Sequence, residues 1–215
     1  GATEPTGELS EAWKDLEMKG EIGRGGMGAV WLAHQIPVGR DVAVKGILGK
    51  SDSTEARLHL LQEGWTTGLL EHPNVVPIYT LGTDESGAPI IVMKRIEGTS
   101  WSEKIRQSGG RPVRDVLDEH LEIFGQVCNA ISFAHDRGIL HRDLKPENVM
   151  LGDFGEVYVV DWGIAASMEG DHGGRLPITG ERSGPIGTPA YMAPEMVAPE
   201  VGELDERTDV YLLGT

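Results

Sequence analysis

The 215-residue chain is 39% hydrophobic and 25% charged, proportions typical of a globular protein that can bury a core. Its net charge of −15 repels nucleic-acid backbones and anionic membranes, so we expect no nucleic-acid partner. The single cysteine, Cys128, excludes an internal disulfide and a cysteine-based metal site, and it suits a reducing compartment.

The N-terminus and the hydropathy of the chain give no sign of membrane targeting. No apolar run approaches the roughly 20 residues that a membrane helix needs, and Gly1–Pro5 lacks the regions of a signal peptide. We therefore expect a cytoplasmic chain without a membrane segment. Residues 1–15 are polar and lack sustained periodicity, which predicts a flexible lead-in with Trp13 docked near its end.

Short apolar runs separated by turn residues predict an antiparallel sheet in the first half of the chain. The expected strands cover residues 16–22, 29–34, 40–47, 78–83 and 89–93. A helix is expected over residues 53–70, with Ser53 or Thr54 as its cap. Five strands and one helix predict a small α+β lobe.

A glycine-rich segment, GRGGMG at residues 23–28, lies between the first two strands. Alone, G-x-G-x-x-G fits a dinucleotide-binding turn as well as a hairpin that covers phosphates. The dinucleotide alternative needs a helix at the third glycine, whereas residues 29–33 favour a strand. We prefer the hairpin, whose glycines let backbone N–H groups approach phosphate oxygens.

Lys45 ends the apolar run Val42–Val44 on a predicted strand. A lysine among apolar residues is costly unless an anion lies near it, so we expect an acidic partner. Glu55, Glu63 and Glu71 on or beside the predicted helix all compete for this place.

Two helices are predicted farther along, at residues 100–107 and 113–136, the second from apolar residues at helical spacing. His120 and His135 lie on the second helix, but no further ligand stands at metal-binding spacing from them. We interpret both as core or surface histidines.

The densest group of reactive side chains is the segment HRDLKPEN at residues 141–148. Asp143, Lys145 and Asn148 supply a carboxylate, a cation and an amide, and Asp161 follows farther on. Phosphoryl transfer from a metal-bound nucleotide needs a carboxylate that orients a hydroxyl, a cation near the phosphate and oxygen ligands for magnesium. The segment therefore predicts that chemistry.

Two acids, Asp153 and Asp161, are candidates for the second metal ligand beside Asn148. Asp153 follows Asn148 too closely for a strand, a turn and a returning strand to lie between them. Residues 149–160 predict that hairpin in full and lead directly to Asp161. Asp161 is thus the predicted ligand and Asp153 a turn residue, although Asp153-Phe154-Gly155 is the literal match to the known metal-binding motif D-F-G.

These motifs, in this order, resemble those of the Hanks-type serine/threonine protein kinases in their bacterial form. The resemblance implies an α+β, protein-kinase-like two-lobe fold: a five-stranded antiparallel small lobe with helix C over residues 16–93, a hinge over 94–98, and a mainly helical large lobe over 99–215. Because the sequence stops inside a helix expected to begin near Asp209, we expect an incomplete large lobe and a fragment that folds poorly alone.

The resemblance also implies roles for the catalytic residues. Asp143 would orient the hydroxyl, Lys145 would neutralise the γ-phosphate, and Thr188 would bond near both. Asn148 and Asp161 would hold Mg²⁺, or Mn²⁺ in its place. The residues after Thr188 would form the floor on which the peptide lies.

On the nucleotide side, the resemblance favours Glu63 as the partner of Lys45, because it stands at the family's spacing before His72-Pro73-Asn74. In the hinge, Lys94-Arg95 departs from the family's usual glutamate plus aromatic pair. The residues expected to contact ATP are Ile22, Gly23, Gly25, Gly28, Val30, Ala43, Lys45, Glu63, Met93, Lys94 and Ile96.

Residues 164–187 resemble a mobile activation loop. Arg142 would bind a phosphate on that loop, and Asp209 would brace the backbone of the catalytic loop. The candidate phosphorylation sites are Ser167, Thr179 and Ser183, with the last two favoured by position.

The expected activity is transfer of the ATP γ-phosphate to Ser/Thr hydroxyls of protein substrates, with autophosphorylation of the activation loop. A nucleotide-binding pseudokinase or scaffold module is the alternative from a different class. Self-association for activation stays open, as does membrane tethering of a longer protein through a segment beyond Thr215.

Overall fold

The computed structural model describes residues 9–25, 28–49, 52–170, 172–179 and 185–215. The chain divides into two compact units. Unit 1 comprises Gly1–Leu69 and Val76–Ile96, and unit 2 comprises Leu70–Val75 and Glu97–Thr215. Residues 70–75, expected in the small lobe, thus group with unit 2.

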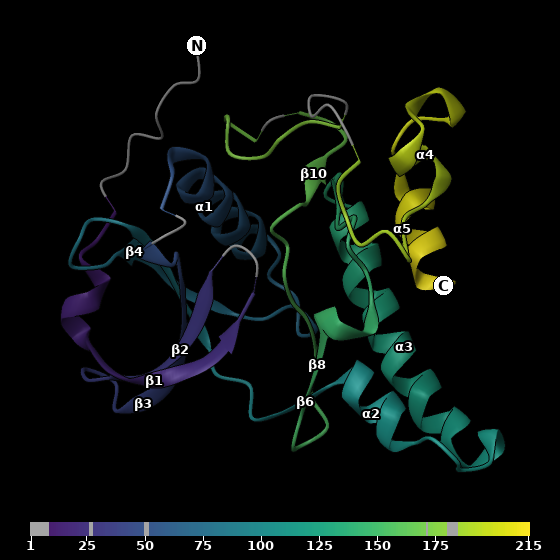
Figure 1. Ribbon diagram of the computed structural model, residues 1–215, viewed down its shortest axis with the longest axis horizontal. Coiled ribbons are helices and arrows are strands. Elements are labelled where there is room, and N and C mark those ends of the chain that lie inside the picture. Colours follow the sequence, from purple (N-terminus) through teal and green to yellow (C-terminus); the bar gives the residue numbers. More distant parts are fainter. Residues whose placement is uncertain (1–8, 26–27, 50–51, 171, 180–184) are drawn as a thin grey trace. The chain divides into compact units, whose positions relative to one another are not determined.

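Unit 1 is built on a five-stranded antiparallel sheet (Figure 1). Its spatial order is β1-β2-β3-β5-β4, so the two hairpins meet where β3 pairs with β5. The strands are β1 (Leu16–Arg24), β2 (Ala29–Gln35), β3 (Arg40–Gly46), β4 (Ile78–Thr83) and β5 (Pro89–Lys94). The α+β fold with this sheet, predicted from the runs of apolar residues, is confirmed.

The two faces of this sheet carry different side chains, because successive residues of a strand point to opposite faces. In register, Val30 lies opposite Lys45, and Ala43 lies opposite Met93, which places these four residues on one face. The other face carries a buried apolar cluster of Ala33, Val42, Val44, Ile90 and Val92.

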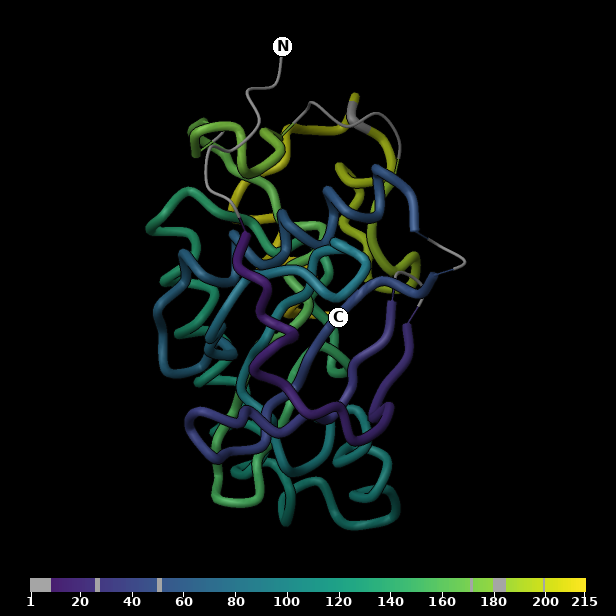
Figure 2. The backbone as a smooth tube through the Cα atoms, turned by 90° about the vertical axis from the view of Figure 1, so that its left-hand side faces the viewer, coloured from purple at the N-terminus to yellow at the C-terminus, as the bar shows by residue number. Residues whose placement is uncertain are grey.

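The N-terminal segment covers that apolar face, in contrast to the flexible lead-in expected from its polarity. The 3-10 helix η1 (Ala12–Asp15) packs Ala12 and Trp13 against the cluster, and Ser10 forms a bridge with Gly82 of β4. Figure 2 shows this purple segment running along the strands. The sequence pattern could not reveal the docking because the partner strand is distant in sequence. Residues 1–8 lie outside the described part.

Helix α1 (Thr54–Leu69) packs against β4 and β5. Ser53 caps it by accepting the N–H of Ala56 at 3.1 Å. Gly64 allows the close approach: a Cβ there would lie 2.8 Å from a methyl carbon of Leu81 and 3.3 Å from Ile91. Ile91 shares the sheet face of Lys45, so α1 covers that face.

Unit 2 is mainly helical (Figure 1). Its longest helix, α3, buries one stripe of apolar residues in a core that also receives side chains from the strands. The helices are α2 (Trp101–Gln107), α3 (Val113–His135), η3 (Pro146–Asn148), α4 (Pro194–Val197), η4 (Pro199–Val201) and α5 (Glu206–Leu213). The strands are β6 (Gly98–Ser100), β7 (Ile139–Leu140), β8 (Val149–Gly152), β9 (Val157–Val159) and β10 (Ala166–Ser167).

The strands of unit 2 form two small antiparallel sheets. One has the order β6-β8-β9, and the other pairs β7 with β10. The hairpin β8–β9 is the one that the sequence predicts between Asn148 and Asp161. Asn74 joins this region, since its amide Nδ2 donates to the carbonyl of Val157 and to Gln126 of α3, both at 3.0 Å.

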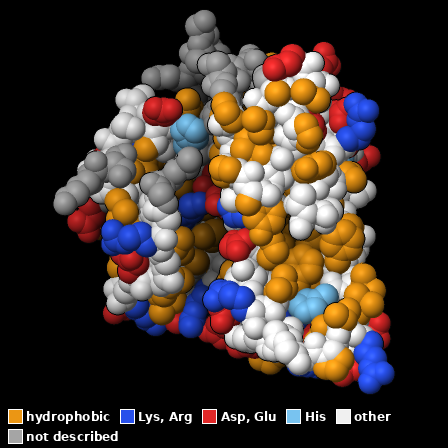
Figure 3. Space-filling view, turned by 45° about the vertical axis from the view of Figure 1, so that its right-hand side comes forward, with side chains coloured by type: hydrophobic (Ala, Val, Ile, Leu, Met, Phe, Trp, Pro, Cys, Tyr) orange, Lys and Arg blue, Asp and Glu red, His pale blue; other side chains and the backbone are white. Residues whose placement is uncertain are grey.

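Unit 2 exposes several large apolar side chains, and hydrophobic atoms gather on the face that Figure 3 brings forward. The exposed apolar residues of its helices are Ile105, Val113, Leu117, Leu121, Val197, Val201, Val210 and Tyr211. No helix within the described ranges is both long enough and apolar enough to cross a bilayer.

Candidate active site

Unit 1 joins Lys45 of β3 to Glu63 of α1. The Lys45 ammonium nitrogen lies 2.6 and 2.7 Å from the two carboxylate oxygens of Glu63. Both side chains are largely buried, with 19% and 12% of their surface exposed. Glu63 is the acid selected by its spacing from His72, and of the competing acids Glu55 lies near His59 instead. The ion pair fixes the ammonium group of a lysine whose strand face also carries Val30 and Ala43.

The glycine-rich hairpin connects β1 and β2, and the N–H of Gly25 donates to the carbonyl of Gly28 at 2.9 Å. Gly28 has no room for a side chain, because a Cβ would lie 2.3 Å from the carbonyl oxygen of Gly46. Gly23 pairs with Val30 in register, and Ile22 beside it is exposed. Gly26 and Met27 lie outside the described residues. The hairpin is a strand–turn–strand, which removes the dinucleotide-fold alternative.

The segment after β5 is anchored by an ion pair. Arg95 donates to Asp41 of β3 at 3.3 Å, and the same carboxylate accepts Lys19 at 2.8 Å and His34 at 3.0 Å. The bonds from Lys19 and, next, His34 lower the pKa of Asp41, against a smaller opposing effect of burial. Arg95, which departs from the usual hinge pattern, therefore has an acidic partner on β3, Asp41. Lys94 and Ile96, the predicted hinge contacts, flank Arg95 and are half-buried.

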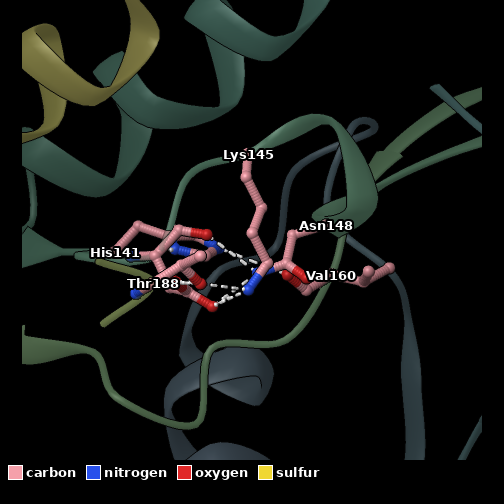
Figure 4. Close-up of polar contacts among 6 residues, drawn as sticks. His141, Lys145, Asn148, Val160 and Thr188 are labelled. Carbon is pink, nitrogen blue, oxygen red and sulfur yellow. Dashed lines mark hydrogen bonds and ion pairs between the residues drawn. The ribbon is translucent and has the colours of Figure 1, made fainter. Parts of the chain in front are cut away.

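In unit 2, a dense hydrogen-bond network surrounds the carboxylate of Asp143. Figure 4 shows three of its partners, Lys145, Asn148 and Thr188, close together. Its Oδ1 accepts the backbone N–H and the hydroxyl of Thr188 at 3.0 and 2.7 Å. Its Oδ2 accepts Lys145 at 2.6 Å and the amide of Asn148 at 3.0 Å. Lys145 also donates to the Thr188 hydroxyl at 2.6 Å. Three residues that were predicted separately, Lys145, Asn148 and Thr188, thus fix the carboxylate of Asp143.

Two oxygen donors in unit 2 suit a divalent cation. Asn148 uses its amide nitrogen to bond Asp143, so its Oδ1 is not engaged by the described residues. Asp161 follows β9 and has a left-handed φ of 63°, a conformation uncommon outside glycine. The described residues contain no group of three or more candidate metal-binding side chains. An ion here would need further oxygen ligands, as Mg²⁺ commonly takes from phosphates and water.

The backbone of the catalytic loop is held by a fully buried acid, Asp209 of α5. Its two oxygens accept the N–H groups of His141 and Arg142, each at 2.9 Å. The loop needs this support because Arg142 has a left-handed φ of 68°. His135 of α3 adds a third contact to Asp209 at 2.8 Å.

The Arg142 side chain is buried and donates through Nε to the carbonyl of Ile164 at 2.6 Å; its Nη2 bonds the same oxygen. It therefore contacts the start of the segment that the sequence predicts as an activation loop. In this structure the guanidinium bonds a carbonyl oxygen of the chain, whereas the resemblance assigned it to a phosphate.

Within that segment, β10 pairs with β7, and the residues around Ile178 return beside it. The N–H of Ser167 donates to the carbonyl of Pro177 at 2.9 Å, and that of Thr179 donates to the carbonyl of Ser167 at 2.8 Å. Ser167 is fully buried and so is inaccessible to a modifying enzyme in this conformation. Thr179 is half-buried, and Ser183 lies outside the described residues.

Two contributors to the site were missed by sequence reasoning. His135 was interpreted as a core or surface residue, yet it contacts Asp209. Thr208, beside Asp209, donates its hydroxyl to Glu195 at 2.8 Å. The only sequence signal for Thr208 was its place in a helix-capping pattern, three residues after Asp205.

The lysine–glutamate pair, the glycine hairpin and the Asp143 network define the class of ATP-dependent phosphotransferases with a two-unit α+β fold. Comparison with known families narrows this class. Residues 16–215 match the family model described as protein kinase domain. The chain therefore belongs to the protein kinase domain family, and members of this family use ATP and a divalent metal ion.

Curated relatives agree with this assignment. The chain is 35% identical to the serine/threonine-protein kinase PknD of Chlamydia muridarum, 38% to that of Chlamydia felis and 34% to that of Protochlamydia amoebophila. Each match covers 90% of this chain but only 23%, 22% and 21% of the respective relative. The chain thus spans less than a quarter of the length of these relatives.

Proposed function

We propose that this chain is the catalytic part of a serine/threonine protein kinase that transfers the γ-phosphate of ATP to protein hydroxyls. The observation that carries the proposal is the fixed Asp143 carboxylate, which Lys145, Asn148 and Thr188 all contact. A carboxylate held by four hydrogen bonds is pre-oriented toward a hydroxyl donor, and the lysine beside it places positive charge next to the reacting phosphate.

Each residue then has one task. Asp143 orients the serine or threonine hydroxyl of the substrate and accepts its proton as the new bond from that oxygen to the γ-phosphorus forms and the bond from the γ-phosphorus to the β–γ bridging oxygen breaks, which releases ADP. Lys145 stabilises charge on the transferred phosphoryl group, and Thr188 holds both side chains in place. Asn148 and Asp161 would hold Mg²⁺, which supplies charge neutralisation to the phosphates. Mn²⁺ suits the same oxygen donors.

Unit 1 handles the nucleotide in this proposal. Lys45, held by its ion pair with Glu63, bonds the α- and β-phosphates, and the glycine hairpin contributes backbone N–H groups. Val30, Ala43 and Met93 share the face of Lys45 and supply apolar contact to adenine. The backbone of Lys94 and Ile96 supplies the polar contacts of the base, so side-chain changes in the hinge leave these in place.

The test is transfer of radiolabelled phosphate from ATP and magnesium by the full-length natural protein and its Asp143→Asn variant. We expect incorporation into serine and threonine of a basic protein and of the protein itself, and loss of nearly all of it in the variant. The matched control is Asp153→Asn, which alters a turn acid of the same unit. Nucleotide binding without any transfer would instead support the pseudokinase alternative.

A further inference from the structure

The hydroxyl of Thr208 links two parts of unit 2 that the proposed mechanism uses separately. Thr208 has no exposed surface, and its Oγ1 donates to Oε1 of Glu195 at 2.8 Å. The same oxygen accepts the N–H of Asp205 at 3.4 Å, which completes the capping box of α5. Glu195 lies in the first turn of α4, directly after the segment that follows Thr188.

The next residue along, Asp209, holds the catalytic loop through the N–H groups of His141 and Arg142. One turn of α5 therefore carries two adjacent anchors, one for each loop. Neighbouring residues of a helix have fixed relative positions, so the distance between the two anchored loops is set by this turn. Thr208 is the anchor whose function the mechanism above does not explain.

We propose that Thr208 is a positioning residue for the protein substrate, through its hydrogen bond to Glu195. The proposal rests on the proposed kinase function, because it assigns residues 189–194 to the floor on which the peptide lies. A hydrogen bond from a hydroxyl to a carboxylate is stronger than one between two neutral groups. Removing the hydroxyl therefore costs this bond and leaves the carboxylate without one of its donors. Without it the start of α4, and the floor before it, loses a fixed attachment.

Substrate binding and chemistry are affected differently by such a loss. Thr188 keeps its two bonds to Asp143, so the reacting groups stay in place. The floor beyond Thr188 is the part that moves. The expected effect is thus a higher KM for the protein substrate, with kcat and the KM for ATP nearly unchanged.

The matched pair Thr208→Val and Thr208→Ser separates the hydroxyl from the packing. Valine keeps the shape and loses the hydroxyl, whereas serine keeps the hydroxyl and loses a methyl group. In the full-length protein we expect valine to raise the KM for the protein substrate about tenfold and serine to change it less than about twofold. Val210→Thr is the surface control, since Val210 lies in the same helix and is 60% exposed among the described residues.

Equal effects of valine and serine, or a valine variant identical to the natural protein, would overturn the proposal. If the valine variant does not fold, the bond is cut from its other end: Glu195→Met should raise this KM more than Glu195→Gln, and equal values refute the role. If the natural protein transfers no phosphate at all, the proposed function fails. The anchoring role of Thr208 can then still be tested by amide hydrogen exchange. Faster exchange of amides 188–197 in the valine variant alone supports the anchor, and unchanged exchange overturns it.

Discussion

Thr188 and Asp143 are joined by two hydrogen bonds to a single oxygen. The backbone N–H of Thr188 lies 3.0 Å and its hydroxyl 2.7 Å from Oδ1 of Asp143, although 45 positions separate the residues. The hydroxyl also accepts Lys145. Thr188 therefore connects the acid and the cation of the proposed mechanism, and its side chain and backbone can be tested apart.

We predict that Thr188→Val lowers kcat by roughly ten- to a hundredfold, since a hydrogen bond to a charged group contributes about 1.5–3 kcal/mol. The backbone bond survives the change, so the KM for ATP should hold steady. Steady-state kinetics with a protein substrate measure both constants. Thr188→Ser retains the hydroxyl and should stay close to the natural enzyme; a serine variant as slow as valine would contradict the assigned role.

Asp161 and Asp153 make a second matched pair. Replacing Asp161 by asparagine removes the negative charge of the proposed metal ligand and should reduce magnesium-dependent turnover by at least about a hundredfold. Asp153 lies in the exposed β8–β9 turn, where its N–H donates to Glu97 at 2.9 Å, so Asp153→Asn should retain most activity. Titrating turnover against magnesium concentration distinguishes the two. The opposite ranking would show that the metal ligand had been assigned to the wrong acid.

The fold was predictable where local pattern determines structure. The five strands of unit 1 and the helices α1 and α3 follow from apolar periodicity and from glycine and proline breaks. The hairpin expected between Asn148 and Asp161 is present as β8 and β9, and it was predictable because strands and turns have minimum lengths; the choice of Asp161 over Asp153 as the metal ligand stays a prediction. The two-residue strands β7 and β10 escaped prediction, since two residues carry no periodicity.

Contacts between distant residues were also beyond local pattern. His135 and Asp209 are 74 positions apart, and nothing in the sequence around His135 indicates its partner. The same holds for Ser10, whose bridge to Gly82 fixes the N-terminal segment on the sheet. Polarity suggested a flexible lead-in there, but backbone pairing and the burial of Trp13 hold the segment in place.

The stability of unit 2 should depend on pH through His141. Burial lowers the pKa of this histidine below its usual value, with Asp209 and the Val160 carbonyl acting in the opposite direction. Its Nδ1 accepts the N–H of Asp143 at 3.2 Å and so carries no proton, which places the proton of the neutral ring on Nε2, near the Val160 carbonyl.

The sign follows from proton binding. Above about pH 6.5 His141 is neutral in both the folded and the unfolded chain, so its contribution to the free energy of unfolding is fully present. As the pH falls below that value, the unfolded chain binds a proton that the folded chain does not, so the free energy of unfolding decreases until the lowered pKa is reached. Urea midpoints at about pH 7.5 and 5.5 measure this. His141→Phe should show a smaller decrease than the natural protein; an equal decrease would assign the effect elsewhere, with His72 the first alternative because burial also lowers its pKa.

Trp162, beside Asp161, has a buried indole N–H without a hydrogen-bond partner among the described residues. Its ring is 1% exposed and lies 4.5 Å, between centroids, from that of His141. An unsatisfied buried donor costs about 1–3 kcal/mol, and phenylalanine removes that donor. The free energy regained in this way offsets much of the cost of the cavity that the smaller ring would leave. We therefore predict that Trp162→Phe changes the free energy of unfolding by no more than about 1 kcal/mol.

The matched control is Trp101→Phe. Trp101 is less buried, but its N–H donates to His120 at 2.8 Å, so its truncation removes a satisfied bond and leaves an acceptor unpaired. Burial alone ranks Trp162→Phe as the more damaging change, whereas hydrogen-bond satisfaction ranks Trp101→Phe as the more damaging one. Denaturant unfolding of the two variants decides between these orders, and a larger loss for Trp162→Phe would mean that packing around the Asp-Trp-Gly segment outweighs its unpaired donor.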